Sequence, residues 1–168
     1  MRNALLLLAR QWEALDAAER MLEQQITRAI QADREARRLM AVPCVGPMIA
    51  STVLAKVSDA RVFRSGRDFA AWIGLTGRDH GTGGKHRVGR ISKQGDRMLR
   101  TLLINGASAY LLHQKRRGLT DPWLRDLLAR RPYKVVMVAL ANKTARIIWA
   151  LLAKGGEYRA RASVPAAA

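Results

Sequence analysis

The sequence is poor in cysteine, histidine and acidic residues, the side chains that hold metals and build disulfide frameworks. Its single cysteine, Cys44, excludes a disulfide framework and a cysteine-based metal site within the chain. The three histidines have no cysteine or carboxylate at metal-binding spacing. The acidic residues after residue 40 are scattered singly, which excludes a cluster for catalytic Mg²⁺. Because Thr82–Lys85 also lacks the spacing of a nucleotide-binding P-loop, we predict no cofactor in this chain.

Long hydrophobic runs are absent as well. The run Leu5–Leu8 is too short to cross a membrane. Its flanks, with Arg10 close behind, do not follow the pattern of a secretory signal peptide. A lone cysteine fits a reducing compartment. These features predict a cytoplasmic protein with no membrane partner.

Positive charge is in excess, on a chain that is also rich in apolar residues. The 168 residues include 30 Lys and Arg against 13 Asp and Glu, a net charge of +17, and 49% of them are hydrophobic. Such a chain can bury a core and is not a disordered basic tail. Residues 1–40 hold seven basic and six acidic residues. Residues 41–168 hold 23 basic and seven acidic residues. The second part is therefore expected to face nucleic acid or another anionic partner.

Residues 1–38 are expected to form a coiled-coil-type helix, because apolar side chains recur at alternating spacings of three and four. No proline or glycine interrupts residues 3–40, which predicts one continuous helix there. The recurring apolar side chains form a stripe along the helix. The stripe fits a coiled coil, which would make the chain a homo-oligomer through residues 5–29. It also fits a long amphipathic helix packed on the domain. Its members are Leu5, Leu8, Trp12, Leu15, Leu22, Ile26 and Ala29, with Glu19 at one charged position.

Residues 39–156 are expected to form a compact all-α domain, and residues 157–168 a disordered tail. Its last helix is apolar nearly all round, which predicts a central place in the core. Phe69, Trp72 and Ile73 are also predicted to lie in the core. Start and stop signals place helices from Pro47, from Ser65-Gly-Arg-Asp68 to Ile73, from between Ser92 and Asp96 to about Gln114, from Asp121-Pro122 to Arg130, and from Pro132 to Gly155-Gly156.

The turn before Pro47 resembles the helix-hairpin-helix module. In that module the turn amides and the start of the second helix hold one nucleic-acid phosphate, which makes Gly46 a candidate phosphate contact. This chain has Cys44 where the module usually has its first glycine. The alternative is a plain helical hairpin with no ligand.

The most informative stretch is residues 74–100, which hold seven glycines and seven Lys or Arg. Glycine lets a backbone approach another molecule closely, and cations at this density favour phosphate. We expect a short hairpin over His80–Ile91, with Gly83 and Gly84 near its tip. The alternative is a basic surface loop without a ligand. The cations expected to contact phosphates are Arg78, Lys85, Arg87, Arg90, Lys93, Arg97 and Arg100.

Two of these cations, Arg97 and Arg100, lie in the opening turns of a predicted helix, where positive charge opposes the helix dipole. A bound anion would explain them. Two hydroxyl side chains, Thr82 and Ser92, are candidate nucleophiles. His80 lies two residues from Thr82, but neither hydroxyl has an evident base beside it, and Ser92 is expected to be a helix cap.

Five blocks of sequence, in this order, resemble the C-terminal domain of the IS-one-ten class of insertion-sequence transposases, the bridge-RNA-guided, Piv-invertase-like DNA recombinases. The blocks are Val42–Pro47, Phe69–Leu75, His80–Lys85, Gly89–Leu103 and Ala139–Leu152. The resemblance covers about residues 40–153. It implies a ribonuclease-H-like acidic domain that binds Mg²⁺, a coiled coil, and a C-terminal domain whose serine attacks DNA. It also implies that DNA and guide RNA share a basic groove across a multimer.

The chain departs from that pattern in two places. The acidic domain is absent from this sequence, and the serine that follows the His80 position in the family is Gly81 here. Thr82 is adjacent, but its hydroxyl would be misplaced, and a displacement of about 1 Å can cost roughly 10²-fold in rate. We therefore expect a truncated transposase that binds DNA and guide RNA but does not cleave DNA alone. The alternatives are an active subunit completed by an acidic domain in trans, and an oligomerising interaction protein.

Overall fold

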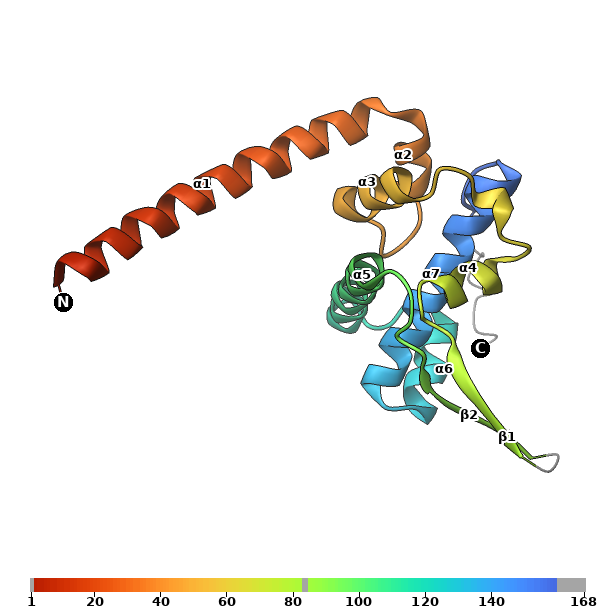
Figure 1. The fold of residues 1–168 in the computed structure, drawn as a ribbon. Helices are drawn as coiled ribbons and strands as arrows, with labels where there is room; N and C mark the ends of the chain where they lie inside the picture. The colour runs from red at the N-terminus through yellow and green to blue at the C-terminus, as the bar shows by residue number, and fades with distance from the viewer. Residues whose placement is uncertain (1, 83–84, 160–168) are drawn as a thin grey trace.

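The computed structural model describes residues 2–82 and 85–159, and only the backbone of residues 79, 80, 82 and 85–88. The all-α fold class is confirmed, because the strands of the described ranges form one two-stranded sheet. In chain order the elements are α1 (Arg2–Ala32), α2 (Arg34–Met40), α3 (Pro47–Lys56), the 3₁₀ turn η1 (Ala60–Val62), α4 (Gly66–Trp72), β1 (Gly77–Thr82), β2 (Lys85–Ile91), α5 (Arg97–Arg116), α6 (Pro122–Arg130) and α7 (Tyr133–Lys154) (Figure 1).

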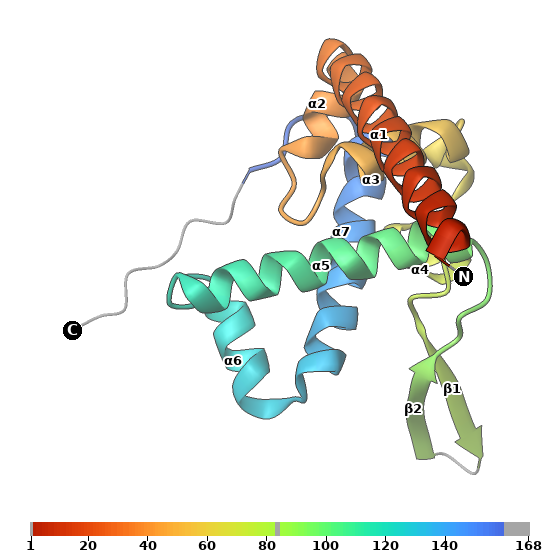
Figure 2. The ribbon, with the colours of Figure 1, turned by 90° about the vertical axis from the view of Figure 1, so that its left-hand side faces the viewer.

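The central element is α7, as its apolar sequence predicts. It contacts α2, α4, α5, α6 and η1, and α5 lies across it (Figure 2). Arg38 of α2 donates hydrogen bonds to the carbonyl oxygens of Leu151 and Gly156 at the end of α7. By length and hydropathy α7 could cross a membrane, a test that a buried core helix passes as well. The buried residues of α7 are Val136, Leu140, Ala141, Thr144, Ala145, Ile148 and Leu151.

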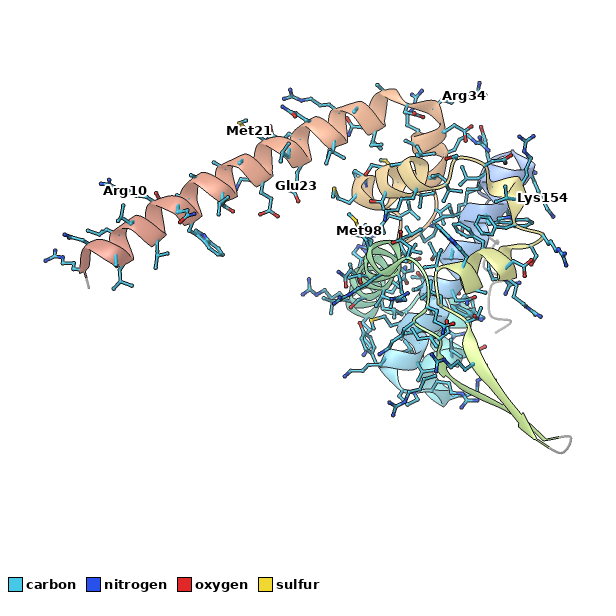
Figure 3. All side chains as sticks on the ribbon, in the orientation of Figure 1. Arg10, Met21, Glu23, Arg34, Met98 and Lys154 are labelled. Carbon is cyan, nitrogen blue, oxygen red and sulfur yellow. The ribbon has the colours of Figure 1, made fainter. Side chains whose placement is uncertain are left out.

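The N-terminal helix α1 projects away from the domain (Figure 1). The large apolar side chains of its stripe between Leu5 and Leu22 are 58–74% exposed, and Ile30 near its end is buried. Figure 3 shows Arg10, Met21 and Glu23 standing in the open along this helix. The alternative of a helix packed along its length on its own domain is therefore wrong, and a coiled coil remains a prediction.

The prediction of one uninterrupted helix over residues 3–40 is also wrong. Asp33 has extended backbone angles, φ −81° and ψ 128°, which end α1 and start α2. Its carboxylate accepts a hydrogen bond from the backbone N–H of Ala36 at 3.0 Å, the geometry of an N-cap. An aspartate is compatible with a solvent-facing helix position, so the sequence pattern did not reveal this break.

The turn between α2 and α3 packs against the middle of α5. Cys44 takes a positive φ of 75°, at the position where the helix-hairpin-helix module has glycine. A Cβ at Gly106 of α5 would overlap the carbonyl oxygen of Cys44, so glycine is required for this approach. Burial raises the pKa of the Cys44 thiol to about 11, and the thiol stays protonated at neutral pH.

The helix α4 starts where the capping motif predicts. The Ser65 hydroxyl accepts a hydrogen bond from the backbone N–H of Asp68 at 3.2 Å. Phe69 and Ile73 are fully buried, as predicted. Trp72 is exposed, with 38% of its surface accessible, so its predicted placement in the core is wrong. Its ring stacks on that of Phe69 at the edge of the core, with 5.8 Å between the ring centroids.

Candidate nucleic-acid interface

The glycine-rich stretch forms an antiparallel hairpin that extends beyond the helices (Figures 1 and 2). Its first strand begins at Gly77, three residues before the predicted start at His80. Gly77 pairs with Ile91 at the base, and Thr82 pairs with Lys85 at the far end. The unpaired backbone groups of the hairpin therefore lie along its two outer edges, away from the core.

Two glycines lock the base of the hairpin to the end of α4. Gly74 has φ +80° and Gly95 has φ +91°, a region that side chains with a Cβ rarely adopt. A Cβ at Gly74 would overlap the carbonyl oxygen of Gln94, and a Cβ at Gly95 would overlap that of Trp72. The segment that enters the hairpin and the segment that leaves it are thus in backbone contact.

Arg100 lies behind this junction and has a different role from the predicted one. Its side chain is buried, and Nη1 donates hydrogen bonds to the carbonyl oxygens of Ile73 at 2.7 Å and Gln94 at 3.4 Å. These bonds satisfy carbonyl groups at the end of α4 and in the loop before α5. The structure therefore explains Arg100 without an anion, and we remove it from the phosphate contacts.

The first turn of α5 shows a second difference. Its N-cap is Asp96, which accepts a hydrogen bond from the backbone N–H of Leu99 at 2.7 Å, so the prediction that Ser92 caps this helix is wrong. Lys56 bonds the same carboxylate and lowers the pKa of Asp96. Arg97 is exposed, and it stays a candidate phosphate contact.

Three of the predicted cations meet at the hairpin base. Arg78 from β1, Arg90 from β2 and Lys93 from the following loop line an open hollow of about 360 Å³ with Ile91 and Ser92. Arg78 donates a hydrogen bond to the carbonyl oxygen of Ser92 at 3.4 Å, which ties its side chain to the segment that leaves the hairpin. No carboxylate lines this hollow in the described part of the chain. The arrangement concentrates positive charge beside an accessible backbone.

The remaining predicted residues lie elsewhere. The exposed Gly81 pairs with His86 toward the far end of the hairpin, about 13 Å along the strand from the pairing of Gly77 and Ile91, so the two candidate nucleophiles Thr82 and Ser92 are at opposite ends. The side chains of Thr82, Lys85 and Arg87, and the residues Gly83 and Gly84, lie outside the described residues.

Gly46 lies in another part of the domain. It precedes the first residue of α3, and a Cβ there would meet nothing within 4 Å. The turn that contains it packs on Gly106, which is about 13 Å along α5 from Arg97. A phosphate at Gly46 would therefore be separate from one at the hairpin base.

The structure adds a basic surface that the sequence did not reveal. An open hollow of about 790 Å³ lies between the start of α4 and the C-terminal half of α7. Its cations come from two segments about 80 residues apart, so no local pattern shows them together. The residues that line it are Arg64, Ser65, Gly66, Arg67, Lys143, Arg146, Ile147, Trp149, Ala150 and Lys154.

The sequence that folds into these elements matches a known protein family. The model of the transposase IS116/IS110/IS902 family matches residues 36–127, from α2 to α6, and the chain belongs to this family. The predicted membership of this class of insertion-sequence transposases is thereby confirmed.

Three relatives show how much of a transposase this chain represents. It is 51% identical over 148 residues to the "Probable family 20 transposase" of Pseudomonas aeruginosa, which covers 88% of this chain and 44% of that protein. The transposase for insertion sequence element IS1111A of Coxiella burnetii is 43% identical over 82% of this chain and 38% of its own length. The transposase for element IS1328 of Yersinia enterocolitica is 37% identical over 80% of this chain and 40% of its own length. The chain thus spans less than half of each of these relatives.

Proposed function

We propose that this chain is the nucleic-acid-binding C-terminal part of a DNA transposase, and that it holds a DNA backbone at the base of its hairpin. The observation that carries the proposal is the meeting of Arg78, Arg90 and Lys93 around a hollow without a described carboxylate. Side chains of this kind contact phosphates and position a duplex without reading its bases. The exposed backbone of the hairpin allows a strand to approach closely.

We further propose that the chain does not cleave DNA alone. The position at which the resemblance implies a serine nucleophile is Gly81, which has no hydroxyl group. The Mg²⁺ that the resemblance implies belongs to the acidic domain. The hairpin base does not fit it, because guanidinium and ammonium groups do not ligate Mg²⁺. A covalent protein–DNA adduct that disappears on Thr82→Ala would overturn this part of the proposal.

The test of the interface is the salt dependence of binding. Replacing Arg78, Arg90 and Lys93 together by glutamine is expected to reduce the slope of log affinity against log salt by about 2–3, since each phosphate contact contributes roughly 0.9 to that slope. Binding to a random-sequence duplex would be measured by fluorescence anisotropy between about 50 and 200 mM salt. The matched control replaces three exposed arginines of α1, namely Arg2, Arg10 and Arg28, and should keep the slope. Equal slopes for the two triple variants would refute the interface.

The exposed stripe of α1 supports a homo-oligomer through residues 5–29 as part of the same proposal. Replacing Leu8 and Leu15 by glutamate should raise the dissociation constant of self-association at least about 100-fold, because each buried leucine contributes roughly 1.5–3 kcal/mol. Sedimentation equilibrium measures this. Leu7 and Met21 are equally exposed but lie outside the stripe, so Leu7→Glu with Met21→Glu is the control. Monomeric wild-type protein at high concentration would contradict the proposal.

The resemblance also implies a guide RNA, which we propose as a second ligand of the same basic face. RNA offers the same phosphodiester backbone as DNA, so the cations of the hairpin base would hold it in the same way. Competition between labelled duplex DNA and unlabelled RNA at the wild-type protein tests this, and weaker binding of both ligands by the hairpin triple variant is the expected result.

A further inference from the structure

The hollow between α4 and α7 has features of a binding surface that the proposed hairpin interface does not use. Five of its ten lining residues are cations, and no carboxylate of the described residues lines it. Within the described residues, none of these five takes part in an ion pair, whereas Arg20, Arg38, Lys56 and Arg61 do. Cations gathered without acidic partners repel one another and attract a polyanion. The five are Arg64, Arg67, Lys143, Arg146 and Lys154.

The cations of α7 occupy one side of the helix. Lys143, Arg146 and Lys154 line the same hollow, and the first and last of them are about 16 Å apart along the helix axis. The opposite side of α7 is buried in the core. Charge on the outer side of a helix is usual, and here the three charged residues have the same sign and line one hollow.

Two tryptophans hold the lysines in place. The Lys143 ammonium lies 4.0 Å from the centroid of the Trp123 ring, and that of Lys154 lies 5.5 Å from the centroid of Trp149. The indole N–H of Trp149 donates a hydrogen bond to the carbonyl oxygen of Ala60 at 3.0 Å, which fixes the ring. Cation–π contacts of this kind order two flexible side chains before any ligand arrives, which lowers the entropy cost of binding.

The close approach of α4 brings the arginines of its start to this row. A Cβ at Gly66 would lie 3.1 Å from the Cα and the carbonyl oxygen of Arg146, so glycine permits the contact between the two helices. Arg64 and Arg67 flank that glycine and line the hollow with the α7 cations. The seven residues of α4 then cover about 10 Å before the chain turns at Gly74 into the hairpin base. The two basic surfaces therefore lie at the two ends of one short helix.

We infer that the hollow between α4 and α7 is a second contact with the sugar-phosphate backbone of the nucleic acid bound at the hairpin, an inference that rests on the proposed function. A polyanion fits it better than a small ligand does, because its cations are exposed on long side chains and spread along the helix. The row on α7 matches the axial length of about five base pairs. The Trp149 ring already contacts Lys154 and is not free to stack on a base. The surface therefore binds phosphates and does not read bases.

The experiment replaces Arg64, Arg67 and Arg146 by glutamine and leaves the two lysines that contact tryptophan. All three arginines are exposed and lack hydrogen-bond partners among the described residues, so the fold should persist, with an unchanged circular dichroism spectrum and melting temperature. The salt slope of binding to a random duplex of about 30 base pairs is expected to fall by about 2–3, and each phosphate contact that the substitutions remove should weaken the affinity roughly tenfold at about 0.1 M salt. The α1 arginine triple variant is the control for total charge.

The outcomes separate the two interfaces. A slope equal to that of the α1 control overturns the inference, while the hairpin triple variant reports independently on the proposed function. If both variants bind like the control, both proposals fail. Unchanged DNA binding with weakened self-association would assign the hollow to a second copy of the chain and overturn the inference. Parallel titrations with single-stranded DNA and RNA of the same sequence identify which backbone supplies the phosphates.

Discussion

Replacing Gly95 with alanine is expected to reduce the free energy of unfolding by about 3–5 kcal/mol. Two costs combine. A φ of +91° disfavours any residue with a Cβ, and the added methyl group would overlap the carbonyl oxygen of Trp72. Relief of the overlap requires the end of α4 and the hairpin base to separate, which also disturbs the backbone contact between Gly74 and Gln94. Urea denaturation followed by tryptophan fluorescence measures the destabilisation.

Gly118 provides a matched control for this prediction. Its φ of +89° is almost the same, but a Cβ there would meet nothing within 4 Å. Gly118→Ala should therefore cost only the backbone strain, about 1–2 kcal/mol. The difference between the two variants isolates the packing of the hairpin base. Equal destabilisation would show that Trp72 and Gly95 move apart freely, and that the base is not locked.

The second large effect is expected at Arg100. Arg100→Met keeps most of the apolar stem but removes the guanidinium that bonds the carbonyl oxygens of Ile73 and Gln94. Leaving these acceptors without a partner should cost about 2–4 kcal/mol of stability. Differential scanning calorimetry and urea denaturation both measure the change. The salt slope of DNA binding should stay the same under conditions where the variant is folded, since the side chain faces the interior.

Arg97 lies in the same helical turn as Arg100, and its substitution is expected to have the opposite effects on stability and on DNA binding. Arg97→Met removes an exposed cation with no hydrogen-bond partner in the described residues, so stability should change by less than about 0.5 kcal/mol. Because Arg97 is a candidate phosphate contact, the substitution should lower the salt slope by about 0.9. If Arg100→Met lowered the slope and Arg97→Met lowered the stability, the assignment of the two arginines would be reversed.

Local signals in the sequence predicted much of the fold. The starts of α3, α6 and α7 coincide with proline signals at Pro47, Pro122 and Pro132, and α7 ends at Gly155, because these residues act through their own backbone angles. The central place of α7 also followed from sequence, since few other faces of the chain are as apolar. These features need no knowledge of distant residues.

Several of the errors arise where the outcome depends on distant contacts. The sequence shows Arg100 as one cation in a basic stretch, and only the packed structure reveals the carbonyl groups that it serves. Both Ser92 and Asp96 fit the sequence pattern of an N-cap. In the structure Asp96 caps the helix, and it also forms an ion pair with Lys56, which is 40 residues away. The hollow between α4 and α7 joins Arg64 to Lys154, so no window of sequence contains it.

The site was predictable in part for the same reason. A hairpin brings its two strands together by local pairing, so the strand pairing within residues 80–91 followed from the glycine pattern. Arg78 lies before the predicted start of the hairpin at His80, so its approach to Arg90 was not predicted. The backbone contact that locks the base of the hairpin could not be predicted from the sequence. It depends on Trp72 and Gly95, which belong to segments that pack only in the folded domain.

The length of α1 has a mechanical consequence. Its 31 residues form a rod of about 46 Å, anchored at one end where Ile30 enters the core. Each residue inserted into this rod would turn the exposed stripe by about 100° relative to the anchor, and three or four insertions would restore its direction approximately. Seven would restore it closely and extend the reach by about 10 Å. Insertions of most other lengths would point the stripe in a different direction relative to the domain, so the direction of the stripe depends on the length of the helix.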